Sequence, residues 1–224
     1  MSLGANYPVS LTGTLTLSFT PDPVTGLPAT GYVDPGLAFA VGNPGSGGLQ
    51  TNFTIPAGTT SVALPSSSIQ VGSVAGTITV TLTGLKANVN GQAQQLALPA
   101  SPPSASITVR RLIPEIVPGS VGKINVTSFG FTVDLHASST PRDLTNAVVS
   151  FTPVPGAQLT GTSFTVMLRS GATSWFGSTN GQNAGGAFDL QIPFPFTGDF
   201  SAIGPVSVTL TNSIGTSVAI SSAK

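Results

Sequence analysis

The sequence predicts an all-β protein, built as two tandem antiparallel β-sandwich domains over residues 1–112 and 113–224. Three observations support this prediction. Apolar residues alternate with Thr and Ser at a period of two, which is typical of strands with one buried and one solvated face. Gly (27 residues) and Pro (19 residues) are enriched and supply turns between these runs. Three strand-like segments also recur about 110 residues later, which is the usual size of one β-sandwich domain.

The recurrence matches segments of similar pattern from the two halves of the chain. The pairs are Gly13–Phe19 with Gly130–Leu135, Asn52–Ile55 with Ser163–Val166, and Gly76–Val80 with Gly186–Leu190. We therefore expect two copies of one module. The segment Arg110–Gly119 contains two prolines that restrict pairing and stiffen the backbone, so it is the predicted linker. Its Glu115 is expected to pair with Arg110 or Arg111.

In the first half, period-two alternation gives each predicted strand one apolar face. The predicted strands are 10–20, 36–42, 49–55, 60–64, 69–72, 76–84, 93–98 and 104–111. The residues expected to face inward are Leu11, Leu15, Leu17 and Phe19, then Ile78, Val80 and Leu82, and finally Ile107 and Val109.

The second half shows the same alternation. Its predicted strands are 121–127, 129–138, 146–152, 162–168, 186–192, 204–212 and 216–221. Pro193 and Pro195 are expected to break ladder pairing, so residues 192–197 are predicted to form an edge or crossover strand. No segment shows a helical period with caps, and Ser174–Gly177 is ambiguous between a short helical turn and a strand.

The composition excludes several classes of function. Charged residues make up only 6% of the chain and its formal net charge is zero, so a nucleic acid partner is not expected. Cysteine is absent, which excludes disulfide, zinc-thiolate and iron–sulfur chemistry. No apolar run reaches the ~18 residues of a membrane helix, so no membrane span is expected in this chain. Low charge density gives weak repulsion between molecules and favours association of the chain with itself or with a solid surface.

Three phrases carry a resemblance to a known family. They are Asn52–Thr60, Val74–Leu82 and the closing Pro205–Ser217. With the Thr-rich alternation and the repeat, they make the chain resemble bacterial extracellular immunoglobulin-like (Ig-like) repeat modules, of the type found in secreted or surface proteins of Acidobacteria. The resemblance implies two Ig-like β-sandwich domains, an extracellular or cell-surface location and a spacer or adhesive role. It supplies no catalytic residue, and the disulfide of antibody domains is missing.

Ionisable residues give no sign of a catalytic or metal site. His136, the only histidine, is expected to lie exposed beside Asp134 on a strand. The aspartates are scattered singly, and Asp22, Asp34 and Asp199 have the neighbours of turn-stabilising residues. No loop concentrates the oxygen ligands that calcium requires. We therefore expect no cofactor.

Aromatic residues are the remaining candidates for a contact with a ligand or partner. Trp175 and Phe176 form one pair, and Phe194 and Phe196 lie in the run Ile192–Phe196. Exposed aromatic side chains can stack on sugar rings. The chain has one Trp and two Tyr, so Trp175 is more simply interpreted as a core or capping residue.

These observations favour a non-enzymatic structural or adhesive module of a secreted or cell-surface bacterial protein. Its expected partners are itself, neighbouring modules of the same protein, or a cell-surface or polysaccharide ligand. Exposed strand edges, such as 10–20 or 192–197, could support assembly by strand addition. The alternative is a carbohydrate-binding accessory domain, which would require Trp175, Tyr7 and Tyr32 to share one exposed face.

Overall fold

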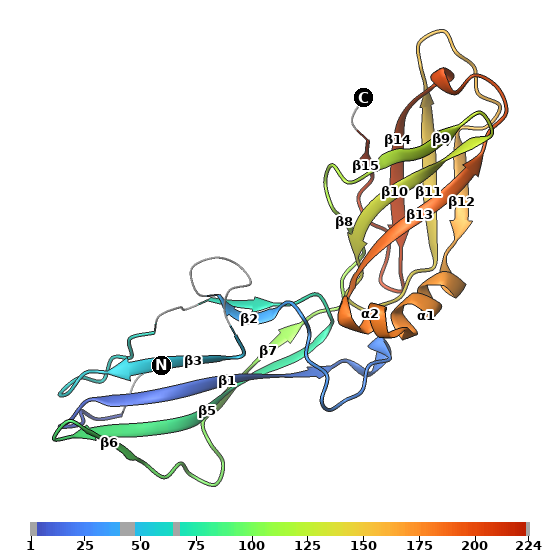
Figure 1. Ribbon diagram of the computed structural model, residues 1–224. Helices are drawn as coiled ribbons and strands as arrows, with labels where there is room; N and C mark the ends of the chain where they lie inside the picture. Colours follow the sequence, from blue (N-terminus) through green and yellow to red (C-terminus); the bar gives the residue numbers. More distant parts are fainter. Residues whose placement is uncertain (1–3, 41–47, 65–67, 223–224) are drawn as a thin grey trace. The chain divides into compact units, whose positions relative to one another are not determined.

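A computed structural model describes residues 4–40, 48–64 and 68–222 (Figure 1). The protein is all-β, with 49% strand and 10% helix, and each pairing between its described strands is antiparallel. The predicted all-β class is confirmed. The described residues form two compact units. The first comprises 4–21, 28–40, 48–64, 68–72 and 76–109, and the second comprises 22–27, 73–75 and 110–222.

The first unit contains a five-stranded sheet and a two-stranded sheet. Their strands are β1 (Leu11–Pro21), β2 (Leu37–Ala40), β3 (Gln50–Ile55), β4 (Ser68–Val71), β5 (Gly76–Val89), β6 (Gln92–Gln95) and β7 (Ser104–Val109). The large sheet has the order β3-β1-β5, and β7 and β6 pair with successive parts of the outer side of β5. β2 and β4 form the small sheet. The predicted strand 60–64 is reduced to an isolated bridge between Ala63 and Thr54, and positions 41 and 42 of the predicted strand 36–42 lie outside the described residues.

β1 lies inside the large sheet. It pairs with β3 over residues 11–16 and with β5 over residues 11–21. The prediction that residues 10–20 form an exposed edge strand is therefore wrong. Alternation along one strand reports which face is buried, and it does not report how many neighbours the strand has.

The core of the first unit lies on the predicted face of β1. All four residues of β1 expected to face inward are buried. Gly13 lies on the same face opposite Phe53 of β3, and a Cβ atom there would come within 2.2 Å of the buried Phe53 ring. At the far side of the sheet, Ile107 of β7 was predicted to face inward but is 36% exposed. The apolar face of the sheet is therefore left uncovered at β7.

The second unit is a sandwich of two four-stranded sheets around one core (Figure 1). Its strands are β8 (Glu115–Ile116), β9 (Gly122–Thr127), β10 (Gly130–Ser138), β11 (Asn146–Pro153), β12 (Ser163–Met167), β13 (Ala187–Pro195), β14 (Ile203–Thr211) and β15 (Ile220–Ser221). In one sheet, β10 lies between β13 and the pair β8 and β9; the other sheet has the order β12-β11-β14-β15. The centre of the core includes Val133, Val149 and Val208, which have no exposed surface.

β13 is the edge strand of its sheet, as predicted for residues 192–197. Its prolines do not interrupt the pairing, however, because Pro193 lies opposite Thr132 and Pro195 opposite Gly130. Proline has no N–H to donate and is accommodated on an edge strand when its nitrogen faces away from the neighbouring strand. The expectation that these prolines break the ladder is wrong, while the edge position is correct.

Two α-helices, α1 (Arg169–Gly177) and α2 (Thr179–Asn183), connect the two sheets of the second unit. Of these residues, only Ser174–Gly177 had a helical turn as one of two predicted alternatives, and the helical alternative is the one observed. Ala172 and Phe176 of α1 pack into the core. Arg142, itself 5% exposed, donates to the carbonyl oxygens of Phe176, Gly181 and Gly185. These tertiary contacts hold the helices, although their sequence has no helical period. Two 3₁₀ helices, Pro23–Thr25 and Phe200–Ala202, complete the described elements.

The ion pair predicted within the linker is not the one observed. Arg111 donates from Nε and one terminal nitrogen to the carboxylate of Asp22, at 2.9 and 3.0 Å. Asp22 also caps the 3₁₀ helix by accepting from the amide of Val24. The Arg111 guanidinium holds the pKa of Asp22 below its ordinary value. Glu115 was expected to pair with Arg110 or Arg111, and it lies in β8, where its backbone pairs with β10.

Candidate functional site

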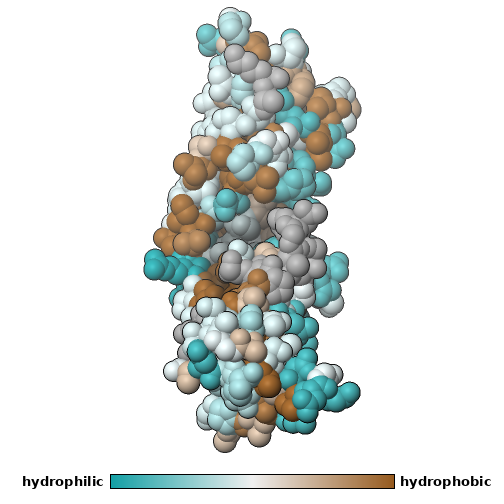
Figure 2. Space-filling model, turned by 90° about the vertical axis from the view of Figure 1, so that its left-hand side faces the viewer, coloured by the Kyte–Doolittle hydropathy of each residue, from teal (hydrophilic) through white to brown (hydrophobic). Residues whose placement is uncertain are grey.

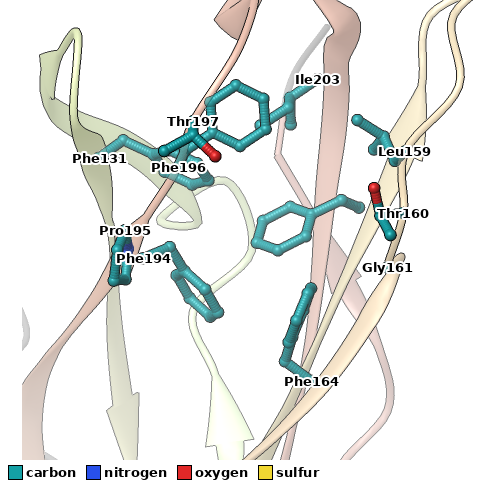
Figure 3. Close-up of a pocket in the computed structure, with 11 residues that line it drawn as sticks. Phe131, Leu159, Thr160, Gly161, Phe164, Phe194, Pro195, Phe196, Thr197 and Ile203 are labelled. Carbon is teal, nitrogen blue, oxygen red and sulfur yellow. The ribbon is translucent and has the colours of Figure 1, made fainter.

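One end of the second unit contains a pocket of about 330 Å³ between the two sheets (Figure 3). β10 and β13 supply Phe131, Phe194 and Pro195 from one sheet, while β11, β12 and β14 supply the other side. The lining residues are Phe131, Phe151, Leu159, Thr160, Gly161, Phe164, Phe194, Pro195, Phe196, Thr197 and Ile203. The pocket therefore depends on segments that are far apart in the sequence.

Phenylalanine is the commonest residue in the lining of the pocket. Phe194 contacts three other phenylalanine rings, with ring centroids 5.8 Å from Phe131, 5.0 Å from Phe151 and 5.8 Å from Phe164. The contacts with Phe151 and Phe164 are edge-on, a favoured arrangement for aromatic pairs. Phe200 packs edge-on against Phe131 behind them. Rings that meet edge to face do not form the flat platform on which a sugar stacks.

Lys123 fixes the backbone beside this cluster. Its ammonium group donates to the carbonyl oxygens of Ile203 and Gly204, at 3.0 and 2.9 Å, and lies over the Phe200 ring. Partial burial lowers the pKa of Lys123. Lys123 thus positions the start of β14, and Ile203 with it, from the opposite sheet.

The chemistry of the pocket is apolar. None of its lining residues is ionisable, and its polar side chains are the hydroxyls of Thr160 and Thr197. Figure 3 shows these two threonines on different sides of the pocket. Such a lining can bind and orient an apolar group, and it offers no acid, base or nucleophile of the strength that catalysis requires.

The four aromatic residues singled out in the sequence fall in two places. Phe194 and Phe196 line the pocket, whereas Trp175 and Phe176 lie on α1, next to the beginning of β13. Phe176 is buried edge-on against Phe188 and also lines the second pocket described below. Trp175 is 37% exposed, and its indole N–H donates to the carbonyl oxygen of Ala187.

A second pocket, of about 290 Å³, adjoins α1. Trp175 lines it together with Met167, which is 73% exposed, and with the polar side chains of Asp189 and Gln191. No sequence pattern indicates this grouping, because β12, α1 and β13 come together only in the folded unit. Tyr7 and Tyr32 belong to the first unit, so no single unit presents all three residues required for the expected aromatic face.

His136 is exposed, as expected, and its partner is Asp189. The imidazole Nδ1 lies 2.5 Å from a carboxylate oxygen of Asp189, which faces it across the β10–β13 pair. This hydrogen bond is the main reason why the pKa of His136 is raised, and the charge of Asp134 adds to it. Asp134 was the expected neighbour of His136. The pairing register that places Asp189 opposite His136 cannot be inferred from the sequence of either strand alone.

Asp34 and Asp199 have the turn roles that were predicted for them. Asp34 accepts from the amide of Gly36, and Asp199 accepts from the amide and hydroxyl of Ser201. The Ser201 contacts lower the pKa of Asp199. Among residues 4–40, 48–64 and 68–222, no group of three or more His, Asp or Glu residues is placed to hold a metal ion.

Comparisons with known proteins give no identification. No protein-family model matches the chain, and a search of curated proteins finds no significant match. None of the helices in the described part of the chain is long and apolar enough to cross a membrane.

Proposed function

We propose that the chain is a non-enzymatic structural or adhesive module of a secreted or cell-surface bacterial protein, and that it associates with itself through the edge of β7. The proposed self-association rests on one observation, which is that one edge of β7 is left unpaired by the described strands. β7 pairs with β5 on one side only, and no described strand pairs with its other side. An unprotected edge strand presents a row of N–H and C=O groups to a second chain.

β7 lacks the features that protect strand edges. Ser104–Val109 contains no charge, proline or glycine, and its residues are exposed or half-buried. By contrast, β13 carries two prolines, and β9 is distorted by the left-handed backbone of Asn125 (φ 52°). Pro102 and Pro103 precede β7 and Arg110 follows it, so strand addition would be limited to these six residues.

The sequence of β7 is complementary to itself. In an antiparallel pair centred on Ile107, that residue meets Ile107 of the second copy, and Ala105 meets Val109 on the same face. Ser106 then meets Thr108 on the opposite face. A two-fold axis relates such a pair, and symmetric dimers are the commonest closed assemblies. The uncovered apolar face at Ile107 becomes partly buried in this arrangement.

Three further observations support an extracellular spacer or adhesive setting of Ig-like type. The second unit has the strand orders β13-β10-β8/β9 and β12-β11-β14-β15, with connections that cross between the sheets, as in Ig-like sandwiches. The sequence phrases described above resemble repeat modules of such proteins. On the face in Figure 2, pale and teal residues separate the brown hydrophobic groups, as expected of a surface rich in Thr, Ser and Gly.

Association can be tested by sedimentation velocity from about 10 µM to about 1 mM, because one strand pair buries little area and predicts a weak dimer. Ile107→Lys places two like charges opposite each other at the centre of the pair and is expected to abolish the dimer. Val126→Lys on β9 is the matched control, since Val126 is also an exposed apolar strand residue. A strict monomer at every concentration would refute assembly. If the Ile107→Lys variant still associates, the contact does not involve β7 and must lie at another strand edge, such as β12.

A carbohydrate-binding accessory domain is the second candidate, favoured by the half-exposed Trp175 beside Asp189 and Gln191. An indole face flanked by polar side chains can stack on one sugar ring and bond its hydroxyls. Because Trp175 is the only tryptophan, a polysaccharide that binds there would change the intrinsic fluorescence, and Trp175→Ala would lose that binding. A glycan array that retains no ligand would count against this function.

A further inference from the structure

We infer that the phenylalanine pocket at the end of the second unit is a binding site for a small apolar molecule, of the size of one aromatic ring with a short substituent. The inference does not rest on the proposed function. The first observation behind the inference is that several phenylalanine rings of the pocket are not fully buried. Phe131 and Phe151 are buried in the core, but Phe164 is 42% exposed, and Phe194 and Phe196 are only partly buried.

Concentration of phenylalanine at one end of the unit is the second observation. The chain has 12 phenylalanines, and half of them form this cluster. They are Phe131, Phe151, Phe164, Phe194, Phe196 and Phe200. Their side chains reach inward from both sheets, yet they leave a space of about 330 Å³ instead of closing it. Filling that space removes apolar surface from water and gains about 25 cal/mol per Å² covered.

The size and lining of the pocket select the class of ligand. A volume of about 330 Å³ is at the small end of the range for small-molecule sites. A sugar fits poorly, because its many hydroxyls would be buried against rings without hydrogen-bond partners. The hydroxyls of Thr160 and Thr197 can bond one polar group, so the lining suits an apolar body with at most one hydroxyl or carbonyl. No ionisable residue lines the pocket to neutralise a charged ligand.

Binding of toluene and phenol to the full chain tests this site by NMR, with ¹³C-labelled methyl groups of Ile and Leu. The methyl signals of Ile203 and Leu159, which line the pocket, are expected to shift saturably. For ligands of so few atoms, the expected dissociation constant is on the order of 0.1–1 mM. Phenol is expected to bind at least as tightly as toluene if a threonine hydroxyl meets its O–H.

Two matched variants of one loop test whether the ligand binds in this pocket. Thr160→Phe places a ring in the pocket from an exposed position and is expected to weaken binding at least about tenfold. Thr162→Phe adds the same ring two residues further on, at an exposed position outside the lining, and is expected to leave binding unchanged. Shifts that grow linearly up to the solubility limit, or equal binding by the Thr160→Phe variant, would overturn the inference. Saturable binding of N-acetylphenylalanine amide, with none of toluene or phenol, would also overturn it and assign the pocket to a side chain of a partner protein.

Discussion

Replacing Arg142 with alanine is expected to destabilise the second unit by about 3–5 kcal/mol. Arg142 is 5% exposed and carries the charge that binds the carbonyl ends of the helical segment. Its terminal nitrogens donate to Gly185 at 3.0 Å, to Gly181 at 3.3 Å and to Phe176. Its guanidinium also lies 5.2 Å from the centre of the Phe176 ring. The final carbonyls of a helix lack partners within the helix, so this cation satisfies groups that would otherwise be buried without one.

The magnitude follows from those contacts. A hydrogen bond to a charged group contributes about 1.5–3 kcal/mol, and three of them give an upper bound of about 4.5–9 kcal/mol. The cation–π contact adds about 0.5–2 kcal/mol. Water entering the vacated space recovers part of this, and single substitutions rarely cost more than about 4–5 kcal/mol. Arg142→Lys keeps the charge but loses the forked geometry, so we expect a smaller loss, of about 1–3 kcal/mol.

Urea unfolding followed by intrinsic fluorescence measures this effect, because Trp175 is the only tryptophan and lies in α1. With a urea dependence of about 1–3 kcal/mol per M, the expected loss of about 3–5 kcal/mol lowers the midpoint by about 1–5 M in Arg142→Ala. Arg169→Ala is the control, since Arg169 begins the same helix but is exposed, and it should change stability by less than about 0.5 kcal/mol. If Arg142→Ala does not fold, Arg142→Lys still gives a measurable midpoint. A loss below about 0.5 kcal/mol in both Arg142 variants would refute the anchoring role.

Two further predictions concern one contact in each unit. Gly13→Ala should destabilise the first unit by about 1–3 kcal/mol, because the added methyl group meets the buried Phe53 ring. Calorimetry measures this change in stability. Unchanged stability would show that the Phe53 ring moves aside without cost. Asp189→Asn should lower the pKa of His136 toward 6.5, as followed by NMR titration of the only histidine. Since the folded-state pKa of His136 is raised, the pair adds stability below about pH 6.5 and loses it as the pH rises through the folded value. An unchanged His136 titration in that variant would show that Asp189 is not its partner.

The strands were predictable because alternation is a local property. Leu11 and Phe131 each begin a run whose apolar side chains recur every second residue, and both runs form strands with that face buried. The helices were not predictable in this way. The segment Arg169–Gly177 contains two glycines and lacks a helical period, and the side chain of Leu168, at the N-cap position, makes no capping hydrogen bond. Its conformation depends on Arg142, which is distant in the sequence.

The candidate pocket was predicted only in part, for the same reason. Phe194 and Phe196 stand out in the sequence because they alternate with Pro193 and Pro195, and both phenylalanines line the pocket. Phe131, Phe151 and Phe164 lie in ordinary alternating strands, where an apolar residue at every second position indicates only a buried face. Only the pairing of β10 with β13 and of β11 with β12 brings their rings together. No local signal distinguishes a phenylalanine that fills a core from one that lines a cavity.

The internal repeat shows where sequence pattern stops determining topology. Gly13–Phe19 and Gly130–Leu135 both lie in strands that pair with the partner expected from the repeat, since β1 pairs with β5 and β10 pairs with β13. The pair Asn52–Ile55 and Ser163–Val166 behaves differently: β3 joins β1 in one sheet, while β12 joins β11 in the opposite sheet. The expectation of two copies with one strand order is therefore wrong for the described residues. A period-two pattern fits any half-buried strand, and it carries no information about which neighbour that strand selects. The uncovered edge at β7 and the pocket beside β12 both arise where the two strand orders differ, so the functional proposals for this chain depend on pairing that the repeat could not specify.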